Sequence, residues 1–345
     1  MKVLGVLLSL VLSWSVYANE GLLNEKSVID HHLHVACFGY QSKCYLGSRA
    51  RENWRFWFYQ KIFDFSESEA KRHGDGYIFD KLAARIKKSK YLKKAVVLAM
   101  DQVYTKEGVV DKDHTEFYVP NEFVAEHARR LPEFEFAASV HPYRPDALEA
   151  LVTAREMGAV YVKLLPAIQR FFINDSSLKD YYHKLVELDL PLLIHVDDES
   201  SFSQESQQFS EPAHLEFPLS LGVTVIVAHA ASNGERDGRP TREIVLELAK
   251  RYPQLIADVS ALTIFTTRKG HLQQIVNSWS ADRLFYGSDF PLTTNLLSSP
   301  WYYLFTLGFQ KTWEIAQISN LWDRDIALKR ALGLPVTVFH QSLVP

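Results

Sequence analysis

Residues 27–36 read SVIDHHLHVA, and this stretch decides how the rest of the chain is interpreted. Its apolar residues predict a β-strand, on which successive side chains alternate between the two faces. His32 and His34 therefore share one face, whereas His31 points to the other. Two imidazoles on one rigid strand can bind a single metal ion, because zinc–nitrogen bonds of about 2.0–2.1 Å need convergent ligands. Buried, hydrogen-bonded histidines at a strand end are the alternative, and the residues that end the later strands decide between the two.

The size and composition of the chain indicate a globular protein with a large core. It has 345 residues, of which 47% are hydrophobic and 13% aromatic. A domain of this size buries about 75% of the surface of its extended chain, so it needs no disulfide scaffold. The formal net charge of −3 provides no polybasic surface for nucleic acid. We therefore expect a small-molecule substrate and no nucleic-acid partner, and a homo-oligomer is left open.

The N-terminal residues predict export. A lysine precedes an apolar run over 3–16, and Val16 and Ala18 occupy the small-residue positions of a cleavage site. This pattern is typical of a secretory signal peptide over residues 1–18, and the run is too short for a good transmembrane span. An uncleaved anchor is the alternative. The prediction is a periplasmic or secreted protein with no stable membrane span after signal removal, folded as a single domain over 19–345.

The only two cysteines are Cys37 and Cys44, shortly after the histidine-rich strand. In an exported protein such a pair can close a short disulfide loop. Thiolate metal ligands are the alternative, which an oxidising compartment disfavours. We therefore predict the Cys37–Cys44 disulfide.

Short apolar or β-branched runs alternate with helical patterns along the chain. Most runs are continuously apolar, which is typical of parallel strands covered on their outer face. The predicted strands are 28–35, 95–100, 134–140, 159–165, 191–196, 223–228, 255–259 and 284–287. The predicted helices are 80–91, 121–131, 146–157, 178–188 and 242–251. This alternation predicts an α/β fold, a (β/α)₈ TIM barrel, with a doubly wound open sheet as the alternative.

The connection after the first strand is long and contains an aromatic-rich stretch. Residues 53–65 read NWRFWFYQKIFDF. We predict that this insertion forms a helix packed on the rim of the barrel. A lid or pocket wall is the alternative, because the loops after barrel strands build the site.

The later predicted strands end in residues that can bind a metal or activate a substrate. The phrases are VKLLP with Lys163, LLIHV with His195, VIVAHA with His229 and FYGSDFP with Asp289. Each residue alone could be a buried structural group. In a barrel, however, the carboxyl ends of the strands meet on one face, and buried polar groups without partners are costly. Together with the first strand, these residues predict one shared site.

The order of these motifs resembles that of the amidohydrolase superfamily. The closer resemblance is to amidohydrolase family 2, also described as predicted TIM-barrel metal-dependent hydrolases. The phrases that carry it are IDHHLH, GAVYVKLLP, LPLLIHV, VAHAASNG, DVSALT and YGSDFP, which span residues 29–291.

The resemblance implies a set of metal ligands and their roles. Asp289 would serve as ligand and general acid/base, and His229 would bind a second ion or position water or substrate. Lys163 matches the lysine that dinuclear members carboxylate to bridge two ions. The cofactor would be one or two divalent ions, with zinc as the first choice. The full implied ligand set is His32, His34, Lys163, His195, His229 and Asp289.

Three functions follow as hypotheses. The first is an exported metal-dependent hydrolase, in which metal-activated water attacks an amide, lactone or ester-type bond. The second is a non-oxidative decarboxylase similar to aminocarboxymuconate semialdehyde decarboxylase. The third is an exported barrel that binds a metal or ligand without catalysis. Substrate contacts are predicted for Arg144, which could pair with a carboxylate or be a structural loop arginine, and for Glu199 and Ser260 on the catalytic face.

Overall fold

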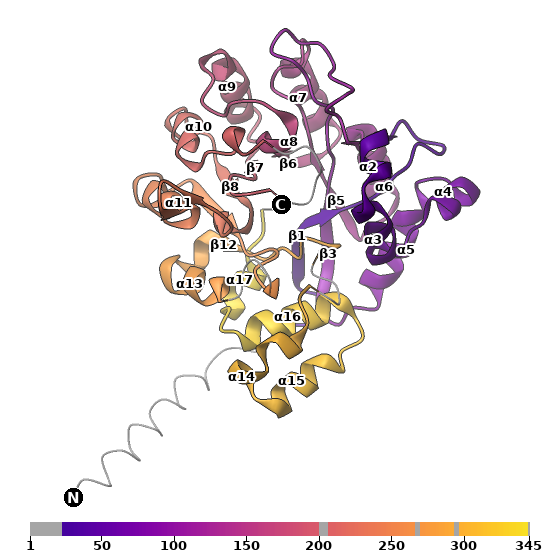
Figure 1. Cartoon of the computed structure of the whole chain (residues 1–345), viewed down its shortest axis with the longest axis vertical. Coiled ribbons are helices and arrows are strands. Elements are labelled where there is room, and N and C mark those ends of the chain that lie inside the picture. The colour runs from indigo at the N-terminus through magenta and orange to yellow at the C-terminus, as the bar shows by residue number, and fades with distance from the viewer. Residues whose placement is uncertain (1–22, 200–205, 266–269, 293–296, 344–345) are drawn as a thin grey trace, which may run out of the picture.

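Eight parallel strands form one sheet that curls into a barrel surrounded by helices (Figure 1). This computed structural model describes residues 23–199, 206–265, 270–292 and 297–343. The predicted signal peptide over 1–18 lies outside the described residues. In sheet order the strands are β1 (Val28–His34), β3 (Leu92–Leu98), β5 (Phe134–Ala138), β6 (Ala159–Leu164), β7 (Leu192–Ile194), β8 (Val225–Val227), β11 (Leu255–Asp258) and β12 (Leu284–Phe285). The predicted TIM barrel is confirmed.

The ring closes between the first and the eighth of these strands. The backbone N–H of His31 donates to Tyr286 O at 3.0 Å, and that of His34 donates to Phe290 O at 3.0 Å. In the other direction, the N–H of Asp289 donates to His32 O at 2.9 Å. These bonds hold the three histidines of β1 beside the residues that follow β12.

The five predicted helices are all present, with ends shifted by a few residues. They are α5 (Tyr77–Lys87), α6 (Asn121–Arg130), α7 (Ala147–Glu156), α9 (Lys179–Glu187) and α11 (Thr241–Arg251). Further helices are α2 (Ser48–Glu52), α3 (Trp54–Phe63), α4 (Glu67–His73), α8 (Pro166–Gln169), α10 (Glu216–Ser220), α13 (His271–Ser278), α14 (Leu304–Leu307), α15 (Phe309–Ala316), α16 (Leu321–Ala331) and α17 (Val336–His340). In the described part of the chain, no helix combines the length and the apolar character that crossing a bilayer requires.

Two short antiparallel pairs accompany the barrel. β2 (Tyr45–Leu46) pairs with β4 (Phe117–Tyr118), and β9 (Glu235–Arg236) pairs with β10 (Arg239–Pro240). The first pair joins the connection after β1 to the connection after β3. Both connections are thereby fixed at the same side of the barrel mouth.

The aromatic-rich stretch after β1 forms α3. Its outer side is exposed to solvent, with Trp54 and Trp57 at 74% and 61% exposure. Its inner side packs on the barrel, where the ring of Phe63 meets that of Phe290 edge-on at 5.6 Å between centroids. Phe56 and Phe63 also line the cavity at the mouth. The helix α3 therefore packs on the rim of the barrel and also forms part of the pocket wall.

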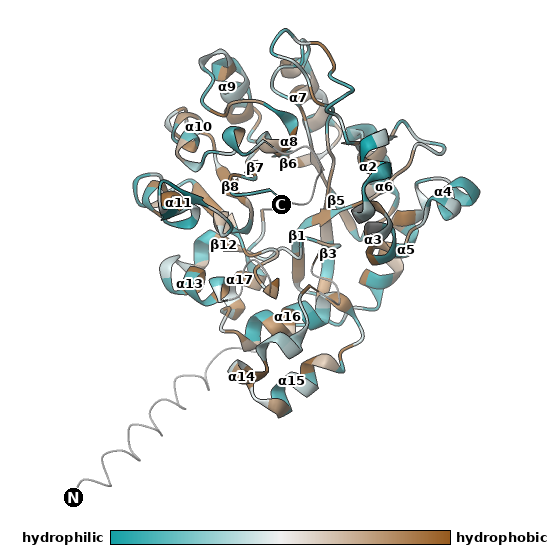
Figure 2. Ribbon diagram, in the orientation of Figure 1, coloured by the Kyte–Doolittle hydropathy of each residue, from teal (hydrophilic) through white to brown (hydrophobic). Residues whose placement is uncertain are grey.

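The core has two parts. A large cluster fills the space between the strands and the outer helices, and a smaller one fills the interior of the barrel. In Figure 2 the helices around the barrel carry both teal and brown segments, as expected of elements with one buried and one exposed side. The smaller cluster includes Val96, Tyr161, Leu193 and Ile226. Because the interior is filled with side chains, a ligand can enter only above this layer.

His31 is part of the structural core, as its predicted orientation implies. Its ring packs edge-on against Phe285 at 5.7 Å between centroids. Burial lowers the pKa of His31 to about 4. His31 does not line the cavity that His32 and His34 line.

A buried carboxylate ties the start of the barrel to its end. Asp30 Oδ1 accepts backbone N–H bonds from His32 at 3.0 Å and Ser288 at 2.8 Å. Its Oδ2 accepts from Ser288 Oγ at 2.5 Å and from the Trp322 indole at 2.8 Å. One side chain thus links β1, the segment after β12 and α16.

Candidate metal centre and active site

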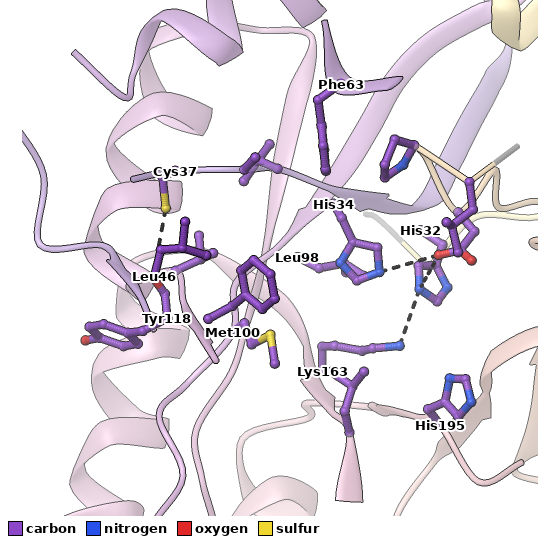
Figure 3. Close-up of a pocket in the computed structure, with 18 of the residues that line it drawn as sticks. His32, His34, Cys37, Leu46, Phe63, Leu98, Met100, Tyr118, Lys163 and His195 are labelled. Carbon is purple, nitrogen blue, oxygen red and sulfur yellow. Dashed lines mark hydrogen bonds and ion pairs between the residues drawn. The ribbon is translucent and has the colours of Figure 1, made fainter. Parts of the chain in front are cut away.

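The carboxyl ends of the strands open into a cavity of about 1240 Å³, its open mouth included. Figure 3 shows His32 and His34 from β1, Lys163 from β6 and His195 from the end of β7 converging at its floor. His229 and Asp289 also line it. All six ligand residues that the sequence predicts therefore border one cavity.

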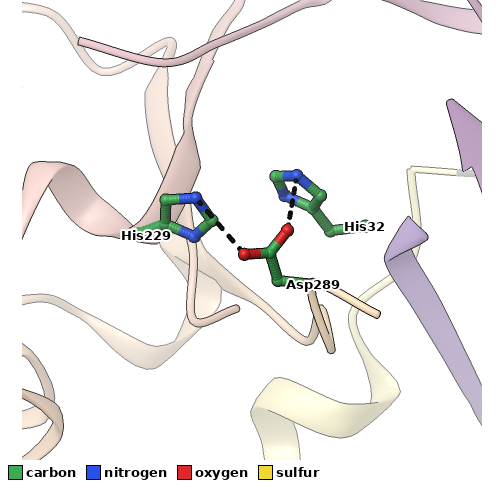
Figure 4. A group of neighbouring side chains, drawn as sticks. All are labelled: His32, His229 and Asp289. Carbon is green, nitrogen blue, oxygen red and sulfur yellow. Dashed lines mark ion pairs between the residues drawn. The ribbon is translucent and has the colours of Figure 1, made fainter. Parts of the chain in front are cut away.

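The carboxylate of Asp289 is the centre of the floor (Figure 4). Its Oδ1 lies 3.4 Å from His32 Nε2 and 3.4 Å from His34 Nε2. Its Oδ2 lies 3.9 Å from His229 Nε2. Two ligands of one tetrahedral zinc ion are about 3.3–3.4 Å apart when the bonds are about 2.0–2.1 Å. The carboxylate and the imidazoles are therefore spaced as ligands of a shared cation.

The tightest group is His32, His229 and Asp289. All three are buried, and one ligand atom from each lies within 4.8 Å of the other two. Imidazole nitrogen and carboxylate oxygen are ordinary donors for zinc and similar divalent ions. The donor set thus fits a divalent metal by both chemistry and spacing. His34 and His195 lie outside this tightest group.

Unusual backbone conformations aim two of these ligands. His229 and Asp289 have positive φ values of 54° and 60°, a region that residues other than glycine rarely adopt. Gly287 allows β12 to approach its neighbours, because a Cβ at this position would lie 2.9 Å from the Cβ atoms of His32 and Ser260. The motif FYGSDFP therefore needs its glycine for close packing and its aspartate for the site.

Asp258, at the end of β11, orients two of the imidazoles. Its Oδ2 lies 2.8 Å from His32 Nδ1, and its Oδ1 accepts the backbone N–H of His229 at 2.8 Å. With Nδ1 bonded to this carboxylate, the Nε2 of His32 is left to face the cavity. Asp258 is not among the residues that the sequence predicts for the site. The available signal was its place in DVSALT, as a carboxylate at a strand end.

Ser260 is also a positioning residue, which corrects the prediction that it contacts substrate. It is fully buried and is not among the residues that line the cavity. Its Oγ lies 2.7 Å from His229 Nδ1 and 3.1 Å from His32 Nδ1. Ser260 lies two residues beyond the end of β11, and its hydroxyl contacts the imidazoles of His32 and His229 instead of entering the cavity.

The electrostatics favour the protonation states that metal ligands need. Burial, and next to it the charge of Lys163, lowers the pKa of His32 to about 4. Burial alone would raise the pKa of Asp289, but His229, His32 and His34 outweigh it and hold the pKa well below its usual range. At neutral pH, His32 is therefore a neutral imidazole and Asp289 an ionised carboxylate.

Lys163 and His195 occupy the adjoining part of the floor. Lys163 Nζ lies 3.3 Å from His32 Nε2, and burial lowers the pKa of this lysine. His195 contacts the Asp197 carboxylate through Nε2, and its Nδ1 lies 3.5 Å from Glu199 Oε2. Burial acts to lower the pKa of His195, but these two carboxylates outweigh it and raise the pKa. His195 thus has acidic partners of its own.

The two remaining residues predicted to bind substrate differ in position. Glu199 lines the cavity, next to His195. Arg144 does not line it, and its guanidinium instead pairs with Asp101 at 3.1 Å and with Asp146 at 2.8 Å. The structure therefore assigns Arg144 to an ion-pair network beside the site.

The cavity wall opposite the floor includes a disulfide. Cys37 and Cys44 are bridged, with their Cα atoms 5.9 Å apart, and Cys37 lines the cavity. The buried carboxylate of Asp75 accepts the backbone N–H groups of Phe38, Gly39 and Tyr40 within this loop. The loop is thus held both covalently and by hydrogen bonds.

A barrel whose strand ends bring imidazoles, a lysine and a carboxylate together defines a class: TIM-barrel proteins with a site that could hold a divalent cation. A family model described as amidohydrolase matches residues 29–310. The chain therefore belongs to the amidohydrolase family, whose members usually bind a divalent metal, and the predicted family is confirmed.

Solved structures with this fold are distant in sequence. An uncharacterised TIM-barrel protein from Bordetella bronchiseptica is 16% identical, with 88% of this chain and 99% of that chain covered and a TM-score of 0.53. A probable 2-pyrone-4,6-dicarboxylic acid hydrolase from Acinetobacter baumannii is 14% identical, with 91% and 97% covered and a TM-score of 0.54. 5-Carboxyvanillate decarboxylase from Sphingomonas paucimobilis is 9% identical, with 93% and 100% covered and a TM-score of 0.48. The first two likenesses show the fold alone. No curated protein sequence matches the chain.

Proposed function

We propose that this protein is a metal-dependent hydrolase that acts on an ester, lactone or amide bond after export from the cytoplasm. The observation that carries the proposal is the Asp289 carboxylate, buried at the cavity floor within 3.4–3.9 Å of three imidazoles. A group in that position can bind a cation and also exchange protons with a reacting molecule in the cavity.

The residues that would hold the metal are His32, His34, His229 and Asp289, with His195 and Lys163 beside them. A divalent cation bound there, with zinc as the first choice, supplies Lewis-acid polarisation and lowers the pKa of water to about 7. Reaction of the Lys163 amine with CO₂ would form a nitrogen–carbon bond and release one proton. The resulting carbamate would add a further carboxylate ligand, as the family resemblance implies.

The protein's own residues handle the proton. Asp289 is ionised, because the neighbouring imidazoles hold its pKa well below the usual range. It would take a proton from the attacking water and deliver it to the leaving group. His229 is fixed through Nδ1 by Ser260, so its Nε2 faces the cavity as an acceptor that can bind the metal.

Two observations support export. The pattern over 1–18 is typical of a secretory signal peptide, and such peptides lead to oxidising compartments. The Cys37–Cys44 disulfide is of a kind that persists in those compartments.

The test compares the metal-loaded protein with its Asp289→Asn variant on a panel of esters, lactones and amides. We expect the variant to lose about 10²–10⁴-fold in kcat while it keeps most of its metal, because it loses the proton-transfer group. Asp80→Asn, the same change at an exposed ion pair with Arg130, is the control and should keep full activity.

Hydrolysis by Asp289→Asn at the parent rate would contradict the assigned role. Release of CO₂ from aromatic or muconate-type acids, with no hydrolysis of the panel, would replace the proposal by decarboxylation. A metal-replete protein inert in both assays would point to a binding barrel without catalysis.

A further inference from the structure

We infer that the substrate is a carbonyl compound whose non-reacting part is uncharged and apolar, with no second carboxylate or phosphate group. The inference rests on the proposed function and adds the substrate class to it. It follows from the contrast between the polar floor of the cavity and its wall.

The wall is apolar and comes from three separate parts of the chain. The connection after β1 and α3 contribute Leu46, Phe56 and Phe63, and the end of β3 contributes Leu98 and Met100. Phe117 of β4 continues the same surface. Figure 3 shows Leu46, Phe63, Leu98 and Met100 beside the imidazole of His34. Such a surface is complementary to aliphatic or aromatic groups, whose burial is favourable.

The charges of the cavity exclude a second anionic group. Among the described residues that line it, Lys163 is the only lysine or arginine, and its Nζ is on the floor, 3.3 Å from His32 Nε2. Asp198 and Glu199 add two acidic groups to the lining. Asp198 pairs with Arg236, which itself does not line the cavity.

A carboxylate placed against this wall would be costly. It would leave water for an apolar surface, and among the described lining residues the one lysine, Lys163, lies on the floor and not in this wall. Arg144, which follows β5, already pairs with two aspartates and lies outside the wall. The site therefore favours a molecule that carries no anionic group away from the carbonyl that reacts at the floor.

The test uses a matched pair of substrates that differ only at the far end of the acyl chain. These are p-nitrophenyl hexanoate and p-nitrophenyl adipate monoester, which carries a terminal carboxylate. With the metal-loaded protein, we expect kcat/KM to be at least 100-fold higher for the hexanoate. Equal values, or a preference for the adipate, would overturn the inference.

A binding measurement separates this inference from the proposed function. If neither ester is hydrolysed, calorimetry with hexanohydroxamic acid and its ω-carboxy analogue still compares the two tails at the metal-loaded site. Binding at least 100-fold tighter for the uncharged tail supports the substrate class even though hydrolysis has failed. Equal affinity, or no binding of either compound, overturns it.

A variant then tests the cause. Phe56→Arg places a cation in the half-buried part of the wall, and we expect it to reduce the preference for the uncharged tail at least tenfold. Phe56→Met, a change without charge, should keep the parent preference. An unchanged preference in a folded Phe56→Arg protein would show that the charge of the wall does not set the specificity.

Discussion

The floor and the wall of the cavity are built in different ways. The floor consists of strand-end residues, each fixed by the barrel and several fixed again by a second residue such as Asp258 or Ser260. The wall consists of connections, stapled by the Cys37–Cys44 disulfide and by the β2–β4 pair. The difference teaches that the barrel positions the reacting groups, whereas the connections select which molecules reach them. Changes at the floor should therefore alter metal binding and turnover, and changes in the wall should alter substrate affinity.

Among the variants that compare the floor with the wall, the largest effect is expected for Asp258→Asn. Asp258 orients His32 through Nδ1, so its loss should weaken metal binding about 10–100-fold and lower kcat with it. Metal affinity is measured by competition with a chelator, and Asp80→Asn serves as the matched exposed control. Metal affinity within twofold of the parent would mean that the floor does not depend on this supporting carboxylate.

Removal of the disulfide should affect the wall and leave the floor unchanged. The Cys37→Ser, Cys44→Ser double variant loses a short closed loop, and we expect the free energy of unfolding to fall by about 2–3 kcal/mol. KM should rise several-fold, while kcat and metal affinity stay near those of the parent. Urea denaturation and steady-state kinetics measure these quantities. If metal affinity falls while KM is unchanged, floor and wall are not independent.

The smallest effect concerns His141, a histidine that follows β5 but belongs to neither region. Its Nδ1 accepts the Tyr143 N–H at 3.1 Å and its Nε2 donates to Gln169 O at 2.7 Å, so it is held neutral. Burial lowers the pKa of His141 to about 4, below the value near 6.5 of an unfolded histidine. Between these values the unfolded chain binds more protons, so stability falls as the pH falls.

From pH 6.5 to pH 5 this contribution amounts to about 2 kcal/mol in the free energy of unfolding. We expect His141→Gln to be less stable than the parent at pH 7 but to lose less stability on acidification. Urea titrations at pH 6.5 and pH 5 measure the free energy of unfolding of both proteins and check this difference in the loss of stability. If the two proteins lose the same free energy between pH 6.5 and pH 5, the buried His141 does not contribute to the pH dependence.

The barrel and its floor could be predicted from the sequence because their signals are local. Continuous apolar runs mark the strands, and closure of the ring forces their carboxyl ends together. The observed strands are shorter than predicted at their carboxyl ends: β8, for example, ends at Val227, before His229. Ligands such as His229 and Asp289 therefore lie on bends just beyond the ladder, where the backbone can aim them.

The supporting residues could not be assigned from the sequence because their partners are remote. Asp258 meets His32 across 226 positions, and Arg144 meets Asp101 across 43. A buried carboxylate or a loop arginine has several possible partners. The packing of several segments decides which of them it contacts. The apolar wall depends in the same way on connections whose paths no strand pattern describes.

The bond from Asp30 to Trp322 has a consequence for how the protein is made. These residues are separated by 292 positions, so Asp30 leaves the ribosome long before Trp322, whose indole donates to its carboxylate. Until then the nascent chain exposes the unpaired edge of its first strand, and contacts of such sequence separation form slowly. We expect newly synthesised chains to need chaperone protection for longer than chains of equal length that fold through neighbouring segments.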